Sequence, residues 1–390
     1  MTQIKKIDFM YEIAFNKKLP AFYSAASENI EGTALLNAES LIVPDLRNVI
    51  HLVYDVPSFL SVCKKNLKAE VGFKSILQHK GYCIDLSKYC DLDTCLKERF
   101  SKSSRQLLRS AKKRLELCFN ISHKIYYGGI DKQHYDELFT RFYDMLKLRS
   151  LEKGINNRNL RHWDLYTEKV YNMILNKQAS LVVIYNDRTP INISLNMHLK
   201  NTVFLFITTY DIDYSKFRLG HTNWMILLDW LIKNHVKIVD FSKGNVAYKK
   251  RWANTEYEFE YHLFYDTSDI RSKMKAIWLA KKLQILQFLR NKNINTYYYK
   301  TLGWLKRKDN SIKIKNYQLE VQSKLPDKKS LEAIDFRGNN KYFYLKRIIY
   351  SYLYRAFLYV ENLRVYKDLQ SKDVYYFQSQ KEVVKVILRH

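Results

Sequence analysis

The most informative part of this chain of 390 residues is the stretch at 208–252, TTYDIDYSKFRLGHTNWMILLDWLIKNHVKIVDFSKGNVAYKKRW. An apolar strand ends there, and a loop with Lys216, Arg218 and Gly220 leads into an apolar helix at about residues 221–234. Glycine lets the backbone approach a ligand closely, and the first N–H groups of a helix have no partner within the helix. Together with the helix dipole and two cations, these groups predict a pyrophosphate cradle, although an ordinary loop before a helix would look the same.

The sequence around this stretch predicts one mixed sheet covered by helices. Three apolar segments joined by tight turns precede the loop, and two more strands and a short helix follow it. The strands are expected at 123–129, 179–186, 191–199, 202–210, 236–241 and 256–265, and the helices from Lys102, at 131–150, at 162–177 and at 245–252. This order of elements is typical of an α+β, or mixed α/β, fold.

The two ends of the chain have different characters. Residues 1–100 alternate short apolar runs with helical stretches, which predicts an N-terminal α/β region. From residue 271 onward the chain is basic and aromatic, with spacing that favours helices. We therefore expect three regions, namely the N-terminal region at 1–100, a central domain at 101–268 and a basic, aromatic-rich helical C-terminal extension at 269–390.

The order of a strand, a phosphate-type loop, a helix, a second strand and then Asn-x-x-Tyr resembles the GNAT acyl-CoA N-acyltransferases. Arg218-Leu219-Gly220-His221-Thr222-Asn223 matches the first half of that family's pyrophosphate loop, while Asn223 replaces its final small residue. The resemblance implies a GNAT fold and acetyl-CoA or another acyl-CoA as co-substrate, with no metal. The residues that it assigns to the cofactor are Lys216, Arg218, Leu219, Gly220, His221, Thr222 and Asn245.

A closer resemblance covers most of residues 85–265. The basic helix SSRQLLR at 103–109, Asp240-Phe241 with Gly244, and Tyr248-Lys249 are similar to the acetyltransferases once named for cellulose biosynthesis. That branch is itself similar to the Fem-type peptidoglycan aminoacyltransferases, which contain two GNAT-like halves. In this light, residues 1–100 would be a degenerate first half, and residues 101–268 the GNAT acyltransferase domain.

The resemblance also implies catalytic roles. Tyr248 stands where the family often places the general acid that protonates the departing CoA thiolate, and a phenol with an ordinary pKa of about 10 suits that leaving group. Lys249 resembles the Fem-type lysine that stabilises the developing oxyanion. Asp211, Asp213 and Asp240 follow strand ends and are candidates for the base or for binding a cationic amine. The plainer alternatives are packing for Tyr248, a solvated side chain for Lys249 and a turn cap for Asp240.

Acceptor binding is assigned to Arg105 and Arg109, one turn apart on the basic helix, and to Tyr210. The two arginines could hold a phosphate or carboxylate of the acceptor, or form an ordinary charged face. His221, at the start of a helix, is a candidate base or a structural side chain. Relatives of this branch are associated with cell-surface polysaccharides, so the expected acceptor is a small-molecule or glycan amine, such as an amino sugar or sugar nucleotide.

Two other classes of function stay open. A Fem-type enzyme would take its acyl group from an aminoacyl-tRNA, although the sequence has no charged heptad hairpin for the helical arm that such enzymes often carry. A non-catalytic binding protein with a GNAT fold is the second alternative, because fold does not determine function.

The formal net charge is +27, and it is concentrated near the C-terminus. Residues 271–390 hold 27 basic and 9 acidic residues, a net charge of +18, which leaves +9 for the rest of the chain. Such an excess favours RNA or an acidic membrane surface as a partner of the extension, whereas drift in codon composition would give it without any function.

The cysteines and the N-terminus indicate where the protein works. The five cysteines, Cys63, Cys83, Cys90, Cys95 and Cys118, have no zinc-ligand spacing, and their odd number favours reduced thiols. The N-terminal segment does not resemble a secretion signal, and the most apolar stretches are too short to span a bilayer. We expect a soluble cytoplasmic protein.

Overall fold

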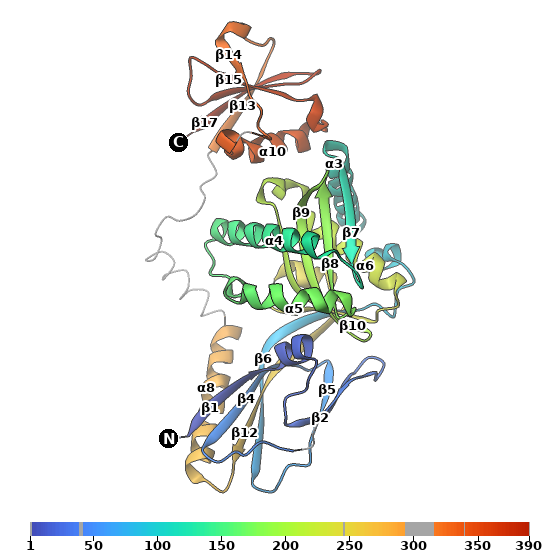
Figure 1. Cartoon of the computed structure of the whole chain (residues 1–390), viewed down its shortest axis with the longest axis vertical. Coiled ribbons are helices and arrows are strands. Elements are labelled where there is room, and N and C mark those ends of the chain that lie inside the picture. Colours follow the sequence, from blue (N-terminus) through green and yellow to red (C-terminus); the bar gives the residue numbers. More distant parts are fainter. Residues whose placement is uncertain (1, 39–41, 245, 293–315, 339, 390) are drawn as a thin grey trace.

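The computed structural model describes residues 2–38, 42–244, 246–292, 316–338 and 340–389. Its centre is a nine-stranded mixed sheet, which joins the strands predicted between residues 123 and 265 to three strands of the first hundred residues (Figure 1). The order across this sheet is β1 (Gln3–Asp8), β4 (Val49–Pro57), β12 (Thr255–Asp266), β6 (Val71–Asp85), β11 (Ile238–Lys243), β10 (Thr202–Tyr210), β9 (Thr189–Leu199), β8 (Ala179–Asn186) and β7 (Ile121–Tyr126). The mixed α/β fold class is confirmed.

Helices cover both faces of the second half of this sheet. Leu181 and Val183 of β8 point to the face covered by α4 (Lys132–Glu152) and α5 (Trp163–Leu175). Val182 points to the opposite face, which is covered by α2 (Leu92–Arg99), α3 (Lys102–Cys118) and α6 (Leu219–Lys233). Successive residues of a strand point to opposite faces, so this largely apolar strand is buried on both sides.

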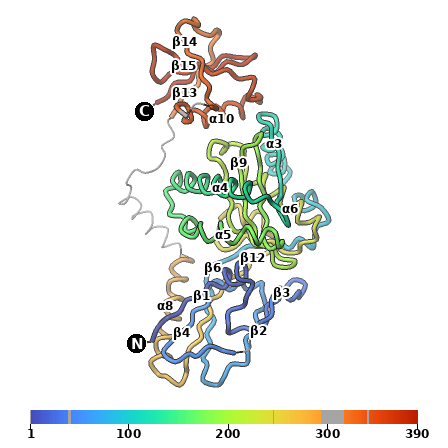
Figure 2. Tube along the Cα trace, in the orientation of Figure 1, coloured from blue at the N-terminus to red at the C-terminus, as the bar shows by residue number. Residues whose placement is uncertain are grey.

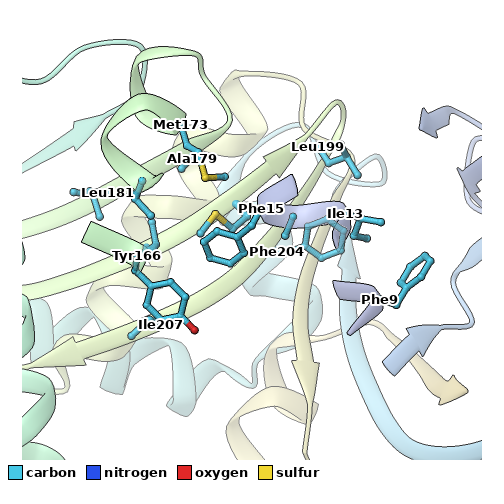
Figure 3. Packing of buried hydrophobic residues seen from close by; sticks show 14 of the residues in the cluster. Phe9, Ile13, Phe15, Tyr166, Met173, Ala179, Leu181, Leu199, Phe204 and Ile207 are labelled. Carbon is cyan, nitrogen blue, oxygen red and sulfur yellow. The ribbon is translucent and has the colours of Figure 1, made fainter. Parts of the chain in front are cut away.

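The first hundred residues are part of the same sheet. β6 lies between β11 and β12 and pairs with both of them in antiparallel fashion. The segment that follows β1 forms α1 (Phe9–Tyr11) and η1 (Glu12–Asn16), and Phe15 of η1 stacks on Tyr166 of α5 with 5.4 Å between ring centres (Figure 3). A three-stranded sheet of β3 (Ala34–Asn37), β2 (Tyr23–Glu28) and β5 (Leu60–Lys64) completes this part.

The sheet opens between β10 and β11. These strands are parallel, but they pair only from Thr202 opposite Ile238 to Phe204 opposite Asp240. Beyond this point β10 continues beside β9, whereas Lys243 at the end of β11 pairs with Gly81 of β6. The parallel strands therefore diverge, and their C-terminal ends border a cleft. The loop after β10 forms η3 (Ile212–Phe217), and α7 (Ala247–Trp252) follows β11.

The C-terminal extension, for which the sequence predicted helices, also contains strands in the part that the structure describes. Helices form at α8 (Ile270–Asn291) and α10 (Lys346–Ala356), where the helical spacing was seen. The other described residues of the extension form mainly a five-stranded sheet in the order β13 (Asn316–Gln322), β17 (Val383–Arg389), β16 (Val374–Gln378), β15 (Arg364–Asp368) and β14 (Leu331–Ala333). In β17 buried residues alternate with partly exposed ones, a period of two that is typical of a half-buried strand.

This C-terminal sheet lies at the opposite end of the molecule from the N-terminal strands (Figure 2). Helix α10 joins it to the central domain, because Tyr350 packs on Phe119 at 4.9 Å and on Tyr214 at 4.7 Å between ring centres. Arg347 also forms an ion pair with Glu152 of α4. None of the described helices combines the length and the apolar character needed to cross a membrane.

Candidate active site

Two adjoining cavities occupy the cleft between β10 and β11. The smaller, of about 280 Å³, is lined by Arg149, Thr208, Tyr210, Ser215, Arg218, Gly220, His221, Trp224 and Tyr248. The larger, of about 570 Å³, extends from the same strands to residues of the N-terminal region. Thr208, Trp224 and Tyr248 line both cavities, so these three residues form the boundary between them.

The smaller cavity is suited to an anion. Helix α6 begins at Leu219, two residues earlier than expected, and no side chain caps its N-terminus. The guanidinium of Arg149 lies 4.1 Å from the ring centre of Tyr210 and donates to the carbonyl oxygen of Thr208 at 3.3 Å. Arg218 lines the same cavity. Two guanidinium groups and an uncapped helix N-terminus favour the binding of phosphate groups.

Gly220 leaves room in this cavity. A Cβ atom added to Gly220 would meet no atom within 4 Å, so the absence of a side chain is not required by packing inside the protein. The residue before the helix, Arg218, has a positive φ of 54°, which turns the chain from η3 into α6. Backbone and side chain of this loop thus border open space beside the start of the helix.

The other residues assigned to the cofactor have different positions. His221 lines the cavity, whereas the side chains of Leu219 and Thr222 are buried. Lys216 is exposed and does not line either cavity of the cleft. Asn245 lies outside the described residues.

Asn223, the departure from the family's loop pattern, does not point into the cavity. Its side chain is fully buried, and its amide donates to Oδ1 of Asn192 on β9 at 2.6 Å. Asn223 therefore contributes to the contact between α6 and the sheet, and its side chain does not fill the cavity.

His221 is held as a neutral imidazole. Burial, aided by Arg218 and Arg251, lowers its pKa from 6.5 to about 4. Its Nδ1 lies 3.1 Å from Nε1 of Trp252, and this indole N–H donates to it. At neutral pH the ring therefore accepts a hydrogen bond from the protein and carries no charge.

Tyr248 lies where the two cavities meet. Its ring centre is 4.8 Å from that of Trp224, and its side chain reaches the cleft from α7. Burial raises the pKa of its hydroxyl, an effect that the charge of Arg149 opposes. The phenol consequently keeps its proton at neutral pH, which a general acid requires.

Asp240 is a buried carboxyl group at the point where β10 and β11 diverge. Its Oδ1 accepts hydrogen bonds from the Ser242 amide at 2.8 Å and the Tyr257 hydroxyl at 2.6 Å. Its Oδ2 has no hydrogen-bond partner among the described residues. Burial raises its pKa from 3.8 to about 6, against the opposing effects of these two donors and Lys249. A base with this pKa is ionised at neutral pH and still able to take a proton.

Lys249 lies beside the larger cavity. Its Nζ donates to the carbonyl oxygens of Lys243 at 2.6 Å and Ser242 at 3.4 Å, which fixes the cation at the end of β11. Burial lowers the pKa of Lys249, while Asp240 acts in the opposite direction. A fixed cation of this kind can stabilise negative charge that develops in the cleft.

Several candidate residues lie outside both cavities. Asp211 forms an ion pair with Arg141 at 2.6 Å and accepts the amide of Asp213, so it holds the start of η3. Asp213 has a pKa raised to about 7 by burial and by Asp211, but it faces the basic residues of α10.

The two arginines of α3 also make contacts within the fold. Arg105 donates to the carbonyl oxygen of Phe100 at 2.6 Å, and Arg109 pairs with Asp93. Neither lines the cleft. Arg105, Arg109 and Asp211 thus lie outside the cleft, whereas Tyr210 lines it.

Other residues of the cleft had not been singled out. They include Arg149 at the end of α4, Trp224 on α6, and Asp8, Tyr54 and Asp55 of the N-terminal region. Trp224 is one of two tryptophans in the predicted apolar helix, and nothing in the sequence distinguishes it from Trp230. No spacing signal connects Asp55 with Asp240, because only the pairing of the sheet places both residues at the lining of one cavity.

The nine-stranded sheet with its covering helices makes the chain a mixed α/β protein. Residues 102–250 match the family model of an acetyltransferase (GNAT) domain, so the resemblance inferred from the sequence is confirmed over this part of the chain. No curated protein matches the chain. The described residues contain no group of three or more His, Cys, Asp or Glu side chains placed to hold a metal ion.

Among the solved structures that are weakly similar to this chain are the following three. A conserved protein of unknown function from Bacteroides thetaiotaomicron is 11% identical over 56% of this chain and 70% of its own, with a TM-score of 0.40. FemX is 12% identical over 49% of this chain and 65% of its own, with a TM-score of 0.38. The C-terminal domain of a putative lysylphosphatidylglycerol synthetase from Agrobacterium fabrum is 10% identical over 60% of this chain and 71% of its own. Its TM-score is also 0.38. TM-scores this low carry no conclusion about activity.

Proposed function

We propose that the chain is an N-acyltransferase that moves an acyl group, with acetyl as the simplest case, from acyl-CoA to an amine. The observation that carries this proposal is the position of Tyr248, which lines both a cavity with two arginines and a cavity with buried carboxylates. A donor with phosphate groups and an acceptor with a basic nitrogen would thus meet at one side chain that can give a proton.

Acyl-CoA would bind with its pyrophosphate in the smaller cavity. Arg149, Arg218 and the N-terminal amides of α6 would bind its oxygens, and Gly220 would allow close approach. The pantetheine would then lie between β10 and β11, whose divergence exposes backbone groups for hydrogen bonding. This orientation directs the thioester towards Tyr248 and the larger cavity.

The chemistry would be direct attack by the amine. Asp240 takes a proton from the ammonium, and the neutral nitrogen attacks the thioester carbonyl, so that a C–N bond forms while the carbonyl oxygen becomes an oxyanion. Lys249 stabilises this negative charge. The intermediate then collapses, the C–S bond breaks, and the thiolate takes the proton of the Tyr248 hydroxyl. The amide nitrogen loses its remaining extra proton to solvent, and Tyr248 is reprotonated from solvent.

The acceptor and the setting follow from the family resemblance. We propose an amine on a small molecule or glycan, such as an amino sugar or sugar nucleotide of a polysaccharide pathway, and a reaction in the cytoplasm. The basic C-terminal part would then be a surface for contact with an anionic partner, which an acyl-CoA reaction does not require.

Titration calorimetry with acetyl-CoA tests this proposal. We compare the wild type with Arg218→Met and with Lys216→Met, a matched control that removes a cation of the same loop outside the cleft. Binding by the wild type and the control, with affinity reduced about tenfold in Arg218→Met, is the expected result. Absence of binding at high micromolar acetyl-CoA would refute it, and tight, steeply salt-dependent binding of tRNA instead would favour an aminoacyl-tRNA donor.

A further inference from the structure

The outer face of helix α8 carries a row of large apolar side chains, which we call the apolar stripe. It consists of Ile270, Met274, Trp278, Ile285 and Phe288, whose relative exposures range from 59% to 73%. At about 100° of rotation per residue, all five lie within about 80° of the helix circumference. Single exposed apolar residues are common on protein surfaces, whereas a row of them on one face marks a contact surface.

The opposite face of α8 fixes the helix to the N-terminal strands. Its buried side chains Ala276, Leu279 and Ala280 belong to one apolar cluster with residues of β4, β6 and β12. Figure 1 shows the helix lying on the outside of these strands. The apolar stripe points away from this contact and is therefore not required for the packing of α8 on the sheet.

The charge of the helix is entirely positive. Residues 270–292 contain no acidic residue and seven basic ones, namely Arg271, Lys273, Lys275, Lys281, Lys282, Arg290 and Lys292. The Nζ atom of Lys282 lies 5.0 Å from the ring centre of Trp278, and that of Lys292 lies 5.9 Å from the ring centre of Phe288. Lysines thus lie directly beside the aromatic residues of the apolar stripe.

We infer that the outer face of α8 is a docking surface for an anionic lipid bilayer. The helix lies parallel to the membrane plane, with the apolar stripe at the boundary between headgroups and acyl chains and the cations at the lipid phosphates. Lys281 falls between Trp278 and Ile285 within the stripe, and its long apolar stem allows its ammonium group to reach the phosphates as well. This inference does not rest on the proposed function, because α8 lines neither cavity of the cleft.

The combination of apolar and cationic groups favours a bilayer over two other occupants. RNA would bind the cations and stack on the aromatic rings, but it would leave Ile270, Met274 and Ile285 in water. A second copy of the chain would cover the apolar stripe, but it would bring two sets of seven cations together, and like charges at an interface repel. An anionic bilayer accommodates both kinds of side chain.

Flotation of the full chain with unilamellar vesicles tests the inference. One preparation contains phosphatidylcholine alone, and the other contains phosphatidylcholine and phosphatidylglycerol in equal amounts. The first variant, Trp278→Ser with Phe288→Ser, removes the aromatic residues of the apolar stripe. Its control, Val321→Ser with Leu369→Ser, removes two apolar side chains of similar exposure from the C-terminal part of the chain.

A second variant tests the charges. Lys281→Glu with Lys282→Glu reverses two cations of α8, and the control Lys112→Glu with Lys113→Glu makes the same change at two adjacent exposed lysines of α3. All the substituted side chains are exposed, so the four variants are expected to fold, and far-UV circular dichroism checks this.

We expect the wild type to bind the vesicles with phosphatidylglycerol about tenfold more tightly than those without it. Each α8 variant should bind the anionic vesicles about tenfold more weakly than the wild type, while both controls bind like the wild type. Absence of wild-type binding to the anionic vesicles, or equal binding by the α8 variants and their controls, would overturn the inference.

Two further measurements identify another occupant if the vesicles do not bind. Binding of an oligouridylate that Lys281→Glu with Lys282→Glu weakens would assign the face to RNA. A dimer in analytical ultracentrifugation that Trp278→Ser with Phe288→Ser dissociates would assign it to a second copy. Either result without vesicle binding overturns the inference, whereas failure of the chain to bind acetyl-CoA refutes only the proposed function.

Discussion

Replacing Asp240 by asparagine tests the central assignment through stability. Burial raises the pKa of this carboxyl from 3.8 to about 6, so the folded protein holds the proton more tightly than the unfolded chain does. At about 1.4 kcal/mol for each pKa unit, this rise corresponds to about 3 kcal/mol. The asparagine side chain would keep the oxygen that accepts from Ser242 and Tyr257, and it would carry no charge.

The sign of the pH dependence follows from proton binding. Between pH 3.8 and about 6 the folded wild type binds more protons at Asp240 than the unfolded chain, so its stability falls as the pH rises through this window. Above about pH 6 the ionised carboxylate destabilises the folded state by a constant amount. Asp240→Asn lacks this effect, and its stability relative to the wild type should increase by about 2 kcal/mol between about pH 4 and about pH 8.

Urea unfolding, monitored by tryptophan fluorescence at several pH values, measures this difference. Any constant cost of the new amide group shifts all the values equally and leaves their pH dependence unchanged. The control Asp93→Asn changes an exposed carboxylate and should not gain stability as the pH rises. A difference between Asp240→Asn and the wild type that stays flat across this pH range would refute the reasoning that Asp240 is a buried, titrating base.

Three further substitutions address the cleft and its support. Tyr248→Phe should lower kcat about 100-fold while calorimetry finds acetyl-CoA affinity unchanged, and full turnover would remove Tyr248 as the acid. Gly220→Leu should weaken acetyl-CoA binding, because its side chain would fill the open space beside the helix. Gly220→Ala should raise the midpoint of thermal unfolding slightly, because alanine favours helix. If Gly220→Leu and the wild type bind acetyl-CoA with equal affinity, this loop does not form a pyrophosphate cradle. Asn223→Leu should cost about 2 kcal/mol in urea unfolding because it leaves Asn192 without its donor, and unchanged stability would show that this bond contributes nothing.

The sequence predicted the central domain well because its signals are local. The turns of the meander, the apolar helix after Gly220 and the strand that contains Asp240 each follow from spacing within a few residues. The C-terminal sheet was missed because aromatic residues at helical spacing in α10 dominated the interpretation, while the alternation in β17 is short. The pairing of strands that lie far apart in the sequence, such as β13 with β17, leaves no pattern within a few residues.

In the cleft, too, residues that belong to local sequence patterns were predicted, and residues placed by long-range strand pairing were not. Arg218 and Gly220 were found because a loop before a helix is readable along the chain, and Tyr248 because it belongs to a short motif. Asp55 could not be found, since only the pairing of β4, β12, β6 and β11 places it at the lining of the cavity that Asp240 also borders. Arg105 looked like a ligand-binding residue, but its charge is used to hold the backbone at Phe100.

The place of β6 in the sheet has a consequence for how the chain is made. This strand is synthesised early, but its partners β11 and β12 leave the ribosome only after more than a hundred further residues. Until then, both edges of a 15-residue strand lack their partners, and unpaired edges are sites of aggregation. Contacts so distant along the chain also slow folding. We therefore expect the nascent N-terminal region to depend on protection from chaperones, and a chain that starts at residue 101 to be insoluble.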